Sequence, residues 1–310
     1  MIRVLFSAKP AAWAEYEAPL RRAFAAAALD CDLTRDHAPE VVDYIVFAPN
    51  GPVKDFTPYK HTKLVMGLWA GVETIVGNAT LTQPLARMVD DGLTQGMVEY
   101  VTGHVLRHHL GMDAHLSGQD GIWRDAIVPP LARDRPVTVL GLGALGAACG
   151  QALAGLGFPV TGWSRSAKEI TGLRCLSGPD GLRAALTNAQ IVVLLLPQTP
   201  ATEDTLNADT LALLGPGACI INPGRGPLID DAALLAALDG GQVGAATLDV
   251  FRTEPLPPDH PYWSHPRVTV TPHIASATRP ETAAQVIADN IARGEAGLPF
   301  LHLVDRAAGY

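Results

Sequence analysis

A glycine-rich turn between an apolar run and an Ala-rich segment most constrains how this chain can fold. The run Val137 to Leu140 leads into Gly141-Leu-Gly-Ala-Leu-Gly146, and residues 147–156 follow with helical character. In a strand–turn–helix of this kind, the first glycine makes the turn, the second lets a pyrophosphate approach the backbone, and the third lets the helix pack on the strand. The phosphates lie at the helix N-terminus. The motif predicts a dinucleotide-binding α/β unit. The expected cofactor contacts are Gly141, Gly143, Ala144, Leu145 and Gly146.

The segment after the next expected strand bears on which dinucleotide is bound. NAD-binding units carry an Asp or Glu about 20 residues past the glycines, where it binds the ribose 2′-hydroxyl. Here the chain instead reads Ser164, Arg165, Ser166 and, two residues on, Lys168. An Arg fork suits the 2′-phosphate of NADP, and a carboxylate would repel it. We therefore expect NADP(H) to be preferred, with NAD(H) possible; the alternative is a solvated basic loop.

Composition narrows the class of protein. The chain has 310 residues, 48% of them hydrophobic and 17% charged, which allows two domains with sizeable cores. Its formal net charge of -8 argues against a nucleic-acid partner. The start of the chain lacks a signal-peptide core, and the apolar run at 191–196 is too short to span a bilayer. Four scattered cysteines predict neither a disulfide framework nor a metal site. We expect a soluble, cytoplasmic protein that binds no metal and no membrane.

Strand-like and helix-like segments alternate along the chain, which is typical of parallel α/β sheets. Before the glycine motif, strands are expected over 2–6, 44–47, 64–66 and 72–76, and a helix over 11–28. A long helix is expected over 94–110, with Thr94 as its N-cap and Gly111 as its end. Beyond the motif, strands are expected over 159–163, 191–196, 218–222, 244–250 and 268–270, and helices over 230–238 and 279–294. The second half thus predicts a doubly wound domain of about six strands.

Three ionisable residues follow expected strands in this second half. They are Arg225 in Asn222-Pro-Gly-Arg-Gly226, Glu254 before Pro255, and His273 in Pro272-His-Ile-Ala275. In an open α/β sheet, ligands bind beyond the carboxyl ends of the strands. A 2-keto acid reductase needs three groups: an Arg that anchors the substrate carboxylate, an acid that protonates the carbonyl oxygen, and a partner that orients this acid. Singly, each residue has a plainer alternative: a solvated Arg, a loop-capping Glu or a structural His. Their joint occurrence behind the glycine motif favours catalysis.

These motifs resemble those of the D-2-hydroxyacid dehydrogenase family, and more narrowly its bacterial glyoxylate/hydroxypyruvate reductase A branch. The resemblance covers nearly the whole chain. Besides the glycine motif and the three loops above, it rests on Trp163-Ser-Arg-Ser166, Leu195-Leu-Pro197 and Leu248-Asp-Val250.

The resemblance implies a role for each ionisable residue. Arg225 would bind the substrate carboxylate and polarise the neighbouring carbonyl. His273 would give a proton to the carbonyl oxygen, and Glu254 would bond the other ring nitrogen and favour the imidazolium.

The resemblance also implies binding residues elsewhere. The turn at Trp69, Ala70 and Gly71 would hold the substrate carboxylate through the amides of Ala70 and Gly71, unless Gly71 merely opens an ordinary turn. Trp69 would either narrow the substrate pocket or fill a core. Asp249 would bond the nicotinamide carboxamide, although it could be a plain strand-end carboxylate. Leu196 and Pro197 would lie beside the cofactor ribose.

The implied architecture has two doubly wound parallel-sheet lobes. Residues 1–95, completed by the C-terminal helix 279–310, would form a flavodoxin-like substrate-binding domain. Residues 96–278 would form an NAD(P)-binding Rossmann domain. The stretch Asp113 to Leu131, with Trp123, would be a dimer arm or an intrachain cover.

The implied function is NADPH-preferring reduction of glyoxylate, hydroxypyruvate or a similar 2-keto acid to the D-2-hydroxy acid, by a homodimer. Two alternatives stay open. One is an NAD-dependent dehydrogenase of a larger D-2-hydroxy acid. The other is a non-catalytic dinucleotide-sensing protein, against which the intact set Arg225, Glu254 and His273 argues.

Overall fold

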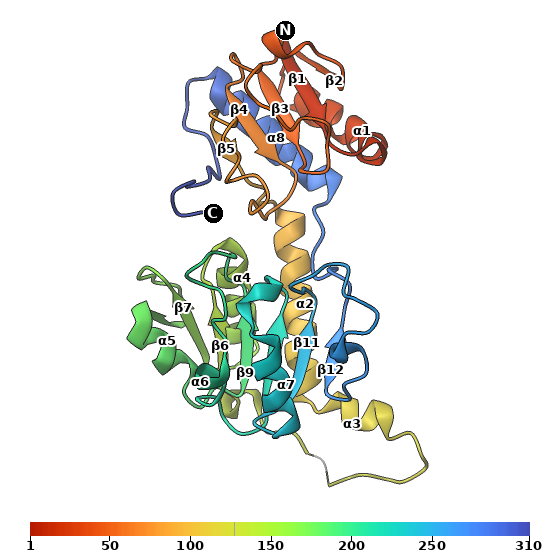
Figure 1. The fold of residues 1–310 in the computed structure, drawn as a ribbon, viewed down its shortest axis with the longest axis vertical. Coiled ribbons are helices and arrows are strands. Elements are labelled where there is room, and N and C mark those ends of the chain that lie inside the picture. The colour runs from red at the N-terminus through yellow and green to blue at the C-terminus, as the bar shows by residue number, and fades with distance from the viewer. Residues whose placement is uncertain (127) are drawn as a thin grey trace. The chain divides into compact units, whose positions relative to one another are not determined.

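The computed structural model describes residues 1–126 and 128–310 of the chain. The chain forms two compact units, one of Met1–Leu93 with Ala277–Tyr310 and one of Thr94–Ser276. Each unit holds a sheet in which every strand pair is parallel (Figure 1). The predicted fold class, two parallel-sheet α/β lobes, is confirmed. In the described part of the chain, no helix is long and apolar enough to cross a membrane.

The first unit is built on a five-stranded sheet of order β2-β1-β3-β4-β5, the doubly wound order of flavodoxin-like folds. Its strands are β1 (Ile2–Ser7), β2 (Cys31–Thr34), β3 (Tyr44–Phe47), β4 (Leu64–Gly67) and β5 (Leu85–Ala86). Helices α1 (Pro10–Ala26) and α8 (Pro280–Glu295) lie side by side on one face (Figure 1). Helix α1 buries Ala12, Tyr16, Leu20 and Phe24, which recur every four residues and so share one face. Loop residues, among them Phe56 and Leu81, cover the other face.

The segment after β4 differs from its prediction. Residues Val72–Val76 form a turn and not a strand, because the amides of Ile75 and Val76 both donate to the carbonyl of Val72, at 3.0 and 2.9 Å. Val72 and Ile75 are buried all the same. An apolar run shows that a segment is buried, but it does not distinguish a turn from a strand.

The second unit holds a seven-stranded sheet of order β12-β11-β10-β9-β6-β7-β8. Its strands are β6 (Val137–Leu140), β7 (Val160–Ser164), β8 (Arg174–Ser177), β9 (Ile191–Leu194), β10 (Ala218–Asn222), β11 (Val243–Leu248) and β12 (Val268–Val270). The sequence did not indicate β8, an edge strand with no fully buried residue. Strand order reverses between β6 and β9, which is where such sheets open a ligand crevice.

Helices cover both faces of this sheet (Figure 1). They are α2 (Asp91–His109), α4 (Ala144–Gly155), α5 (Gly178–Leu186), α6 (Ala208–Leu211) and α7 (Asp231–Asp239). The short helix α3 (Met112–Ser117) has no buried residue. Short 3-10 helices lie at Pro39–Val41, Ala132–Asp134, Gly226–Leu228 and Pro261–Trp263. Ile127, within the stretch predicted as a dimer arm, lies outside the described residues.

The start of α2 is also corrected. The helix begins at Asp91, and the carboxylate of Asp90 accepts a hydrogen bond from the amide of Leu93 at 3.3 Å, so Thr94 is not the N-cap. Its end agrees with the prediction, because Gly111 adopts the left-handed conformation, with φ of 63°.

Candidate active site

The glycine turn follows β6 at the point where the strand order reverses, and its three glycines differ in what surrounds them. Gly141 has φ of +104°, and a Cβ there would collide with the carbonyl of Leu195. A Cβ on Gly146 would collide with the carbonyl of Gly141. A Cβ on Gly143, by contrast, would meet nothing within 4 Å. The first and third glycines are therefore required by the fold, whereas the second keeps open the space in front of the helix.

Helix α4 begins at this open space. Gly143 is its N-cap and contributes no side-chain hydrogen bond, so the first-turn amides depend on another acceptor. Ala144 is exposed beside Gly143, and Leu145 is half-buried. Amides at the N-terminus of a 12-residue helix, facing open space, fit the pyrophosphate of a dinucleotide.

The predicted 2′-phosphate residues follow β7, the neighbour of β6. Ser164 ends the strand and is buried, and its hydroxyl donates to the carbonyl of Ser166 at 2.8 Å. Arg165, Ser166 and Lys168 are exposed. Two cations on an exposed loop can reach a phosphate without first losing a buried contact.

The three predicted catalytic residues follow three adjacent strands whose ends are in register. Asn222 of β10 pairs with Leu248 of β11, and Leu248 pairs with Val270 of β12. Arg225, Glu254 and His273 lie beyond these positions, so they leave the sheet at the same edge.

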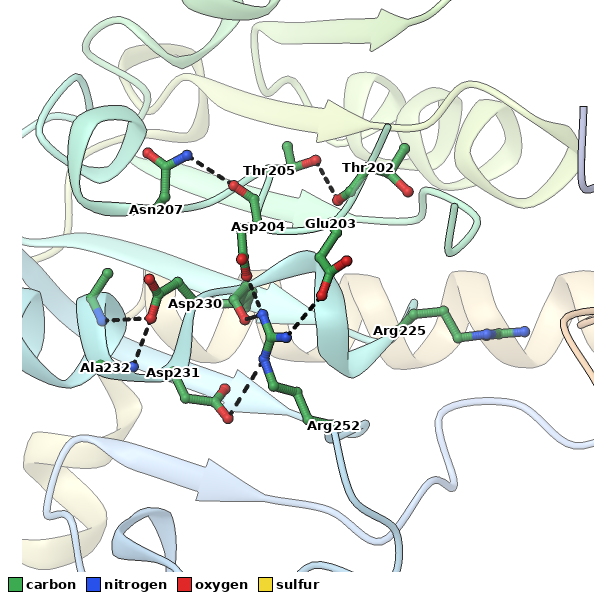
Figure 2. Close-up of polar contacts among 12 residues, drawn as sticks. Thr202, Glu203, Asp204, Thr205, Asn207, Arg225, Asp230, Asp231, Ala232 and Arg252 are labelled. Atoms are coloured by element: carbon green, nitrogen blue, oxygen red, sulfur yellow. Dashed lines mark hydrogen bonds and ion pairs between the residues drawn. The ribbon is translucent and has the colours of Figure 1, made fainter. Parts of the chain in front are cut away.

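The Arg225 loop is held by Asn222 and packs on the Glu254 loop. The Asn222 side chain donates to the carbonyl of Arg225 at 2.9 Å and accepts from the amide of Gly224 at 3.1 Å. A Cβ on Gly226 would collide with the backbone of Phe251, so only glycine allows the two loops to approach this closely. The Arg225 side chain points away from the neighbouring acidic residues (Figure 2).

Glu254 and His273 form a hydrogen-bonded pair, at 2.7 Å between Glu254 Oε2 and His273 Nδ1. The other oxygen, Oε1, accepts from the amide of Phe251 at 2.9 Å, which fixes the carboxylate plane. The His273 side chain is 55% exposed. Because Nδ1 is bound to Glu254, Nε2 is the nitrogen that can meet a substrate oxygen. This is the geometry of a general acid and its orienting carboxylate.

Asp249 makes contacts that its predicted role did not include. It has no exposed surface. Its carboxylate accepts from Thr271 Oγ1 at 2.6 Å and from the amides of Ile274 and Ala275 at 2.9 Å each. The contact to a nicotinamide carboxamide stays a prediction, whereas the contacts to the His273 loop are present.

Arg252 was not identified from the sequence. Its guanidinium lies among Glu203, Asp204 and Asp231, and it also donates to the carbonyl of Ile229 at 2.8 Å (Figure 2). The acidic pairs at 203–204 and 230–231 were the available signal. Arg252 thereby anchors the loop that carries Glu254.

In the other unit, the Trp69–Gly71 turn follows β4. The carbonyl of Trp69 accepts from the amide of Met88 at 3.0 Å, and Ala70 and Gly71 are half-buried. Trp69 is 42% exposed, so the alternative that it fills a core is wrong.

Comparison with known proteins gives a consistent result. Residues 102–275 match the model of the family described as D-isomer specific 2-hydroxyacid dehydrogenase, NAD binding domain. The chain is 42% identical over 257 residues to a glyoxylate/hydroxypyruvate reductase A from Yersinia enterocolitica, which covers 80% of this chain and 82% of the relative.

Two solved structures are similar along the whole chain. A D-isomer specific 2-hydroxyacid dehydrogenase from Xanthobacter autotrophicus Py2, in complex with NADPH and MES, has a TM-score of 0.93 and 40% identity, covering 100% of this chain and 99% of that one. An NADPH-dependent glyoxylate/hydroxypyruvate reductase from Sinorhizobium meliloti, in complex with NADP and sulfate, has a TM-score of 0.88 and 36% identity, covering 100% of both chains.

The fold and these matches define the class, an NAD(P)-dependent oxidoreductase. Within that class, the chain belongs to the D-isomer specific 2-hydroxyacid dehydrogenase family, as its motifs predicted.

Proposed function

We propose that this protein reduces small 2-keto acids, glyoxylate and hydroxypyruvate among them, to D-2-hydroxy acids, with NADPH as the preferred reductant. The observation that carries the proposal is the His273–Glu254 pair, at 2.7 Å, on the same sheet edge as Arg225. The curated relative named above is a glyoxylate/hydroxypyruvate reductase A, which supports the substrate class.

Each of the three side chains has one role in this reaction. Arg225 binds the substrate carboxylate, and its charge polarises the adjacent carbonyl. His273 donates its Nε2 proton to the carbonyl oxygen. Glu254 holds the Nδ1–H, which fixes the ring orientation and stabilises the protonated ring before transfer.

Residues at the start of α4 and in the loop after β7 would hold the cofactor. NADPH supplies the hydride in this reaction. The amides at Gly143, Ala144 and Leu145 would hold the pyrophosphate, and Arg165 with Lys168 would hold the 2′-phosphate. The two solved relatives contain NADPH or NADP, which supports this choice. NAD(H) has the same pyrophosphate and so can bind, but it binds more weakly because it lacks the 2′-phosphate. Ser164, Ser166, Leu196 and Pro197 complete the proposed set.

The other unit is proposed to bind the substrate. The amides of Ala70 and Gly71 would donate hydrogen bonds to its carboxylate, and Trp69 would limit its size. This assignment rests on the sequence pattern. It makes residues 1–95 with 279–310 the substrate-binding domain and 96–278 the nucleotide-binding domain.

A panel of 2-keto acids against both cofactors tests the proposed function. The purified protein should oxidise NADPH with glyoxylate or hydroxypyruvate, at a higher kcat/KM than with NADH. Turnover only with NADH and a bulkier keto acid would favour the NAD-dependent alternative. Binding of NADPH without turnover of any keto acid would favour a dinucleotide sensor.

We further propose a homodimer. Between 110 and 131 the chain exposes several large apolar side chains, with Trp123 at 89% and Val128 at 80% exposure. Light scattering should give twice the chain mass, and Trp123→Ser should shift it toward the monomer. A monomeric wild type would contradict this proposal.

A cytoplasmic location is proposed because all four cysteines are free thiols, two of them buried. Thiol titration of freshly isolated, denatured protein should give four reactive groups per chain. Oxidised cysteines in that preparation would contradict it.

A further inference from the structure

The loop that carries His273 adopts a conformation that its own residues do not favour. His273 has φ of 54°, in the left-handed region that only a small fraction of residues other than glycine occupy. Its amide donates to the Asp249 carbonyl at 2.8 Å, and the next two amides donate to the Asp249 carboxylate. The main chain and the side chain of Asp249 therefore together hold the backbone from His273 to Ala275.

A chain of hydroxyl groups holds the Asp249 side chain. Thr271 Oγ1 donates to Asp249 Oδ1 at 2.6 Å, and the Tyr100 hydroxyl lies 2.7 Å from Thr271 Oγ1. A threonine hydroxyl has one hydrogen, which is committed to Asp249, so Tyr100 must be the donor to Thr271. Burial raises the pKa of Tyr100 to about 12, so this hydroxyl keeps its proton at neutral pH. Hydrogen bonds to an ionised acceptor are stronger than neutral ones.

Tyr100 is itself held in place. It belongs to α2, whose later residues bond to β11 and β12, the strands that precede Asp249 and Thr271. His108 Nε2 lies 3.0 Å from Thr247 Oγ1 of β11, and Arg107 donates to Thr269 Oγ1 of β12 at 2.9 Å. The Tyr100 ring packs on His104, with 4.4 Å between ring centroids. The Tyr100 hydroxyl therefore belongs to a helix that two further hydrogen bonds tie to β11 and β12.

We propose that Tyr100 and Thr271 are positioning residues that act through Asp249 to hold the His273 loop, so that the imidazole meets Glu254. Neither residue touches substrate or cofactor in this account. The kinetic part of the test rests on the proposed function, whereas the exchange part does not.

Substitutions at Thr271 test the proposal, with Thr269 as a matched control on the same strand end. Thr271→Val keeps the shape and removes the hydroxyl, so kcat should fall about tenfold to hundredfold, the loss expected for one hydrogen bond to a charged group. Thr271→Ser should recover most of kcat, and Tyr100→Phe should give a smaller loss than Thr271→Val. Thr269→Val removes the contact to Arg107 but leaves the bonds from Tyr100 to Thr271 and from Thr271 to Asp249, so it should lower kcat much less than Thr271→Val.

Amide hydrogen exchange tests the same contacts without turnover. The peptide that contains Ile274 and Ala275 should exchange faster in Thr271→Val and in Tyr100→Phe than in the wild type or Thr269→Val. Equal exchange and equal kcat in Thr271→Val and the wild type would overturn the proposal. So would equal losses in Thr271→Val and Thr269→Val. A wild type without keto acid turnover would remove the proposed function, while the exchange result would still decide whether Asp249 is held in this way.

Discussion

Two regions along the carboxyl edge of the seven-stranded sheet are built differently. Beyond β10, β11 and β12, the predicted catalytic residues stand on loops fixed by buried groups: Asn222 is 1% exposed and Asp249 is fully buried. Beyond β7, the predicted 2′-phosphate residues Arg165 and Lys168 stand on an exposed loop.

This difference indicates whether a substitution should alter the rate or the cofactor preference. In the proposed reaction, catalytic geometry depends on buried hydrogen bonds, and a buried group left without its partner costs about 1–3 kcal/mol. The proposed cofactor preference depends instead on charged side chains that are exposed. We therefore expect substitutions in the loops after β10, β11 and β12 to alter the rate, and substitutions in the loop after β7 to alter cofactor preference with no loss of stability.

The largest effect is expected at His273. His273→Gln removes the proton donor, and general acid catalysis contributes about 10² to 10⁴ in rate, so kcat should fall by that factor. NADPH affinity, measured by fluorescence titration, should hold. A kcat within a few-fold of the wild type would show that the proton comes from elsewhere.

Arg225→Lys should give the next largest effect. A lysine keeps the charge but loses the planar fork that binds a carboxylate through two parallel bonds. We expect the KM for glyoxylate to rise and kcat to fall together, with kcat/KM lower by about tenfold to hundredfold. Arg267→Lys, whose arginine donates to the Leu238 carbonyl, is the matched control and should leave both constants unchanged. A silent Arg225→Lys would remove the anchor role.

Substitutions in the exposed loop after β7 should change the cofactor preference. Arg165→Ser with Lys168→Ser should lower kcat/KM for NADPH by about tenfold to hundredfold, because charge-assisted bonds to the 2′-phosphate are lost. The value for NADH and the melting temperature should change little. Arg174→Ser, an exposed cation at the start of β8, serves as control. Equal losses with both cofactors would show that the loop does not read the 2′-phosphate.

The last prediction concerns the dependence of stability on pH and not catalysis. Burial, followed by the nearby Arg107, lowers the pKa of His108 from 6.5 to about 4. The unfolded chain therefore binds a proton that the folded chain does not, and stability falls as the pH drops from 6.5 toward 4. Above 6.5 both states are neutral, and His108 adds no pH dependence. The loss should reach about 3 kcal/mol at the acid end.

Urea unfolding at a series of pH values measures this loss. His108→Gln should flatten the fall, whereas the exposed His115→Gln should not. An identical pH slope in His108→Gln and the wild type would contradict the assignment.

The central strands could be predicted from the sequence because each is a short apolar run between turn residues. Strands β3 and β10 have the predicted bounds. The two-residue β5 and the edge strand β8 carry no such run, and Val72–Val76 carries one inside a turn. Local patterns therefore locate buried segments better than they assign their conformation.

The site divides in the same way. Arg225, Glu254 and His273 could be identified because residues after parallel strands share one sheet edge. The bond from Tyr100 to Thr271 joins positions 171 residues apart, and Arg252 reaches Glu203 across 49. No local pattern encodes such contacts, because they arise only when the strands and α2 pack together.

The product of hydroxypyruvate reduction tests the central claim most directly. The protein should be incubated with NADPH and hydroxypyruvate, and the glycerate separated by enantiomer. The account predicts D-glycerate in an amount equal to the NADPH consumed, and none with His273→Gln over the same time. L-glycerate, or NADPH left unconsumed by the wild type, would contradict it.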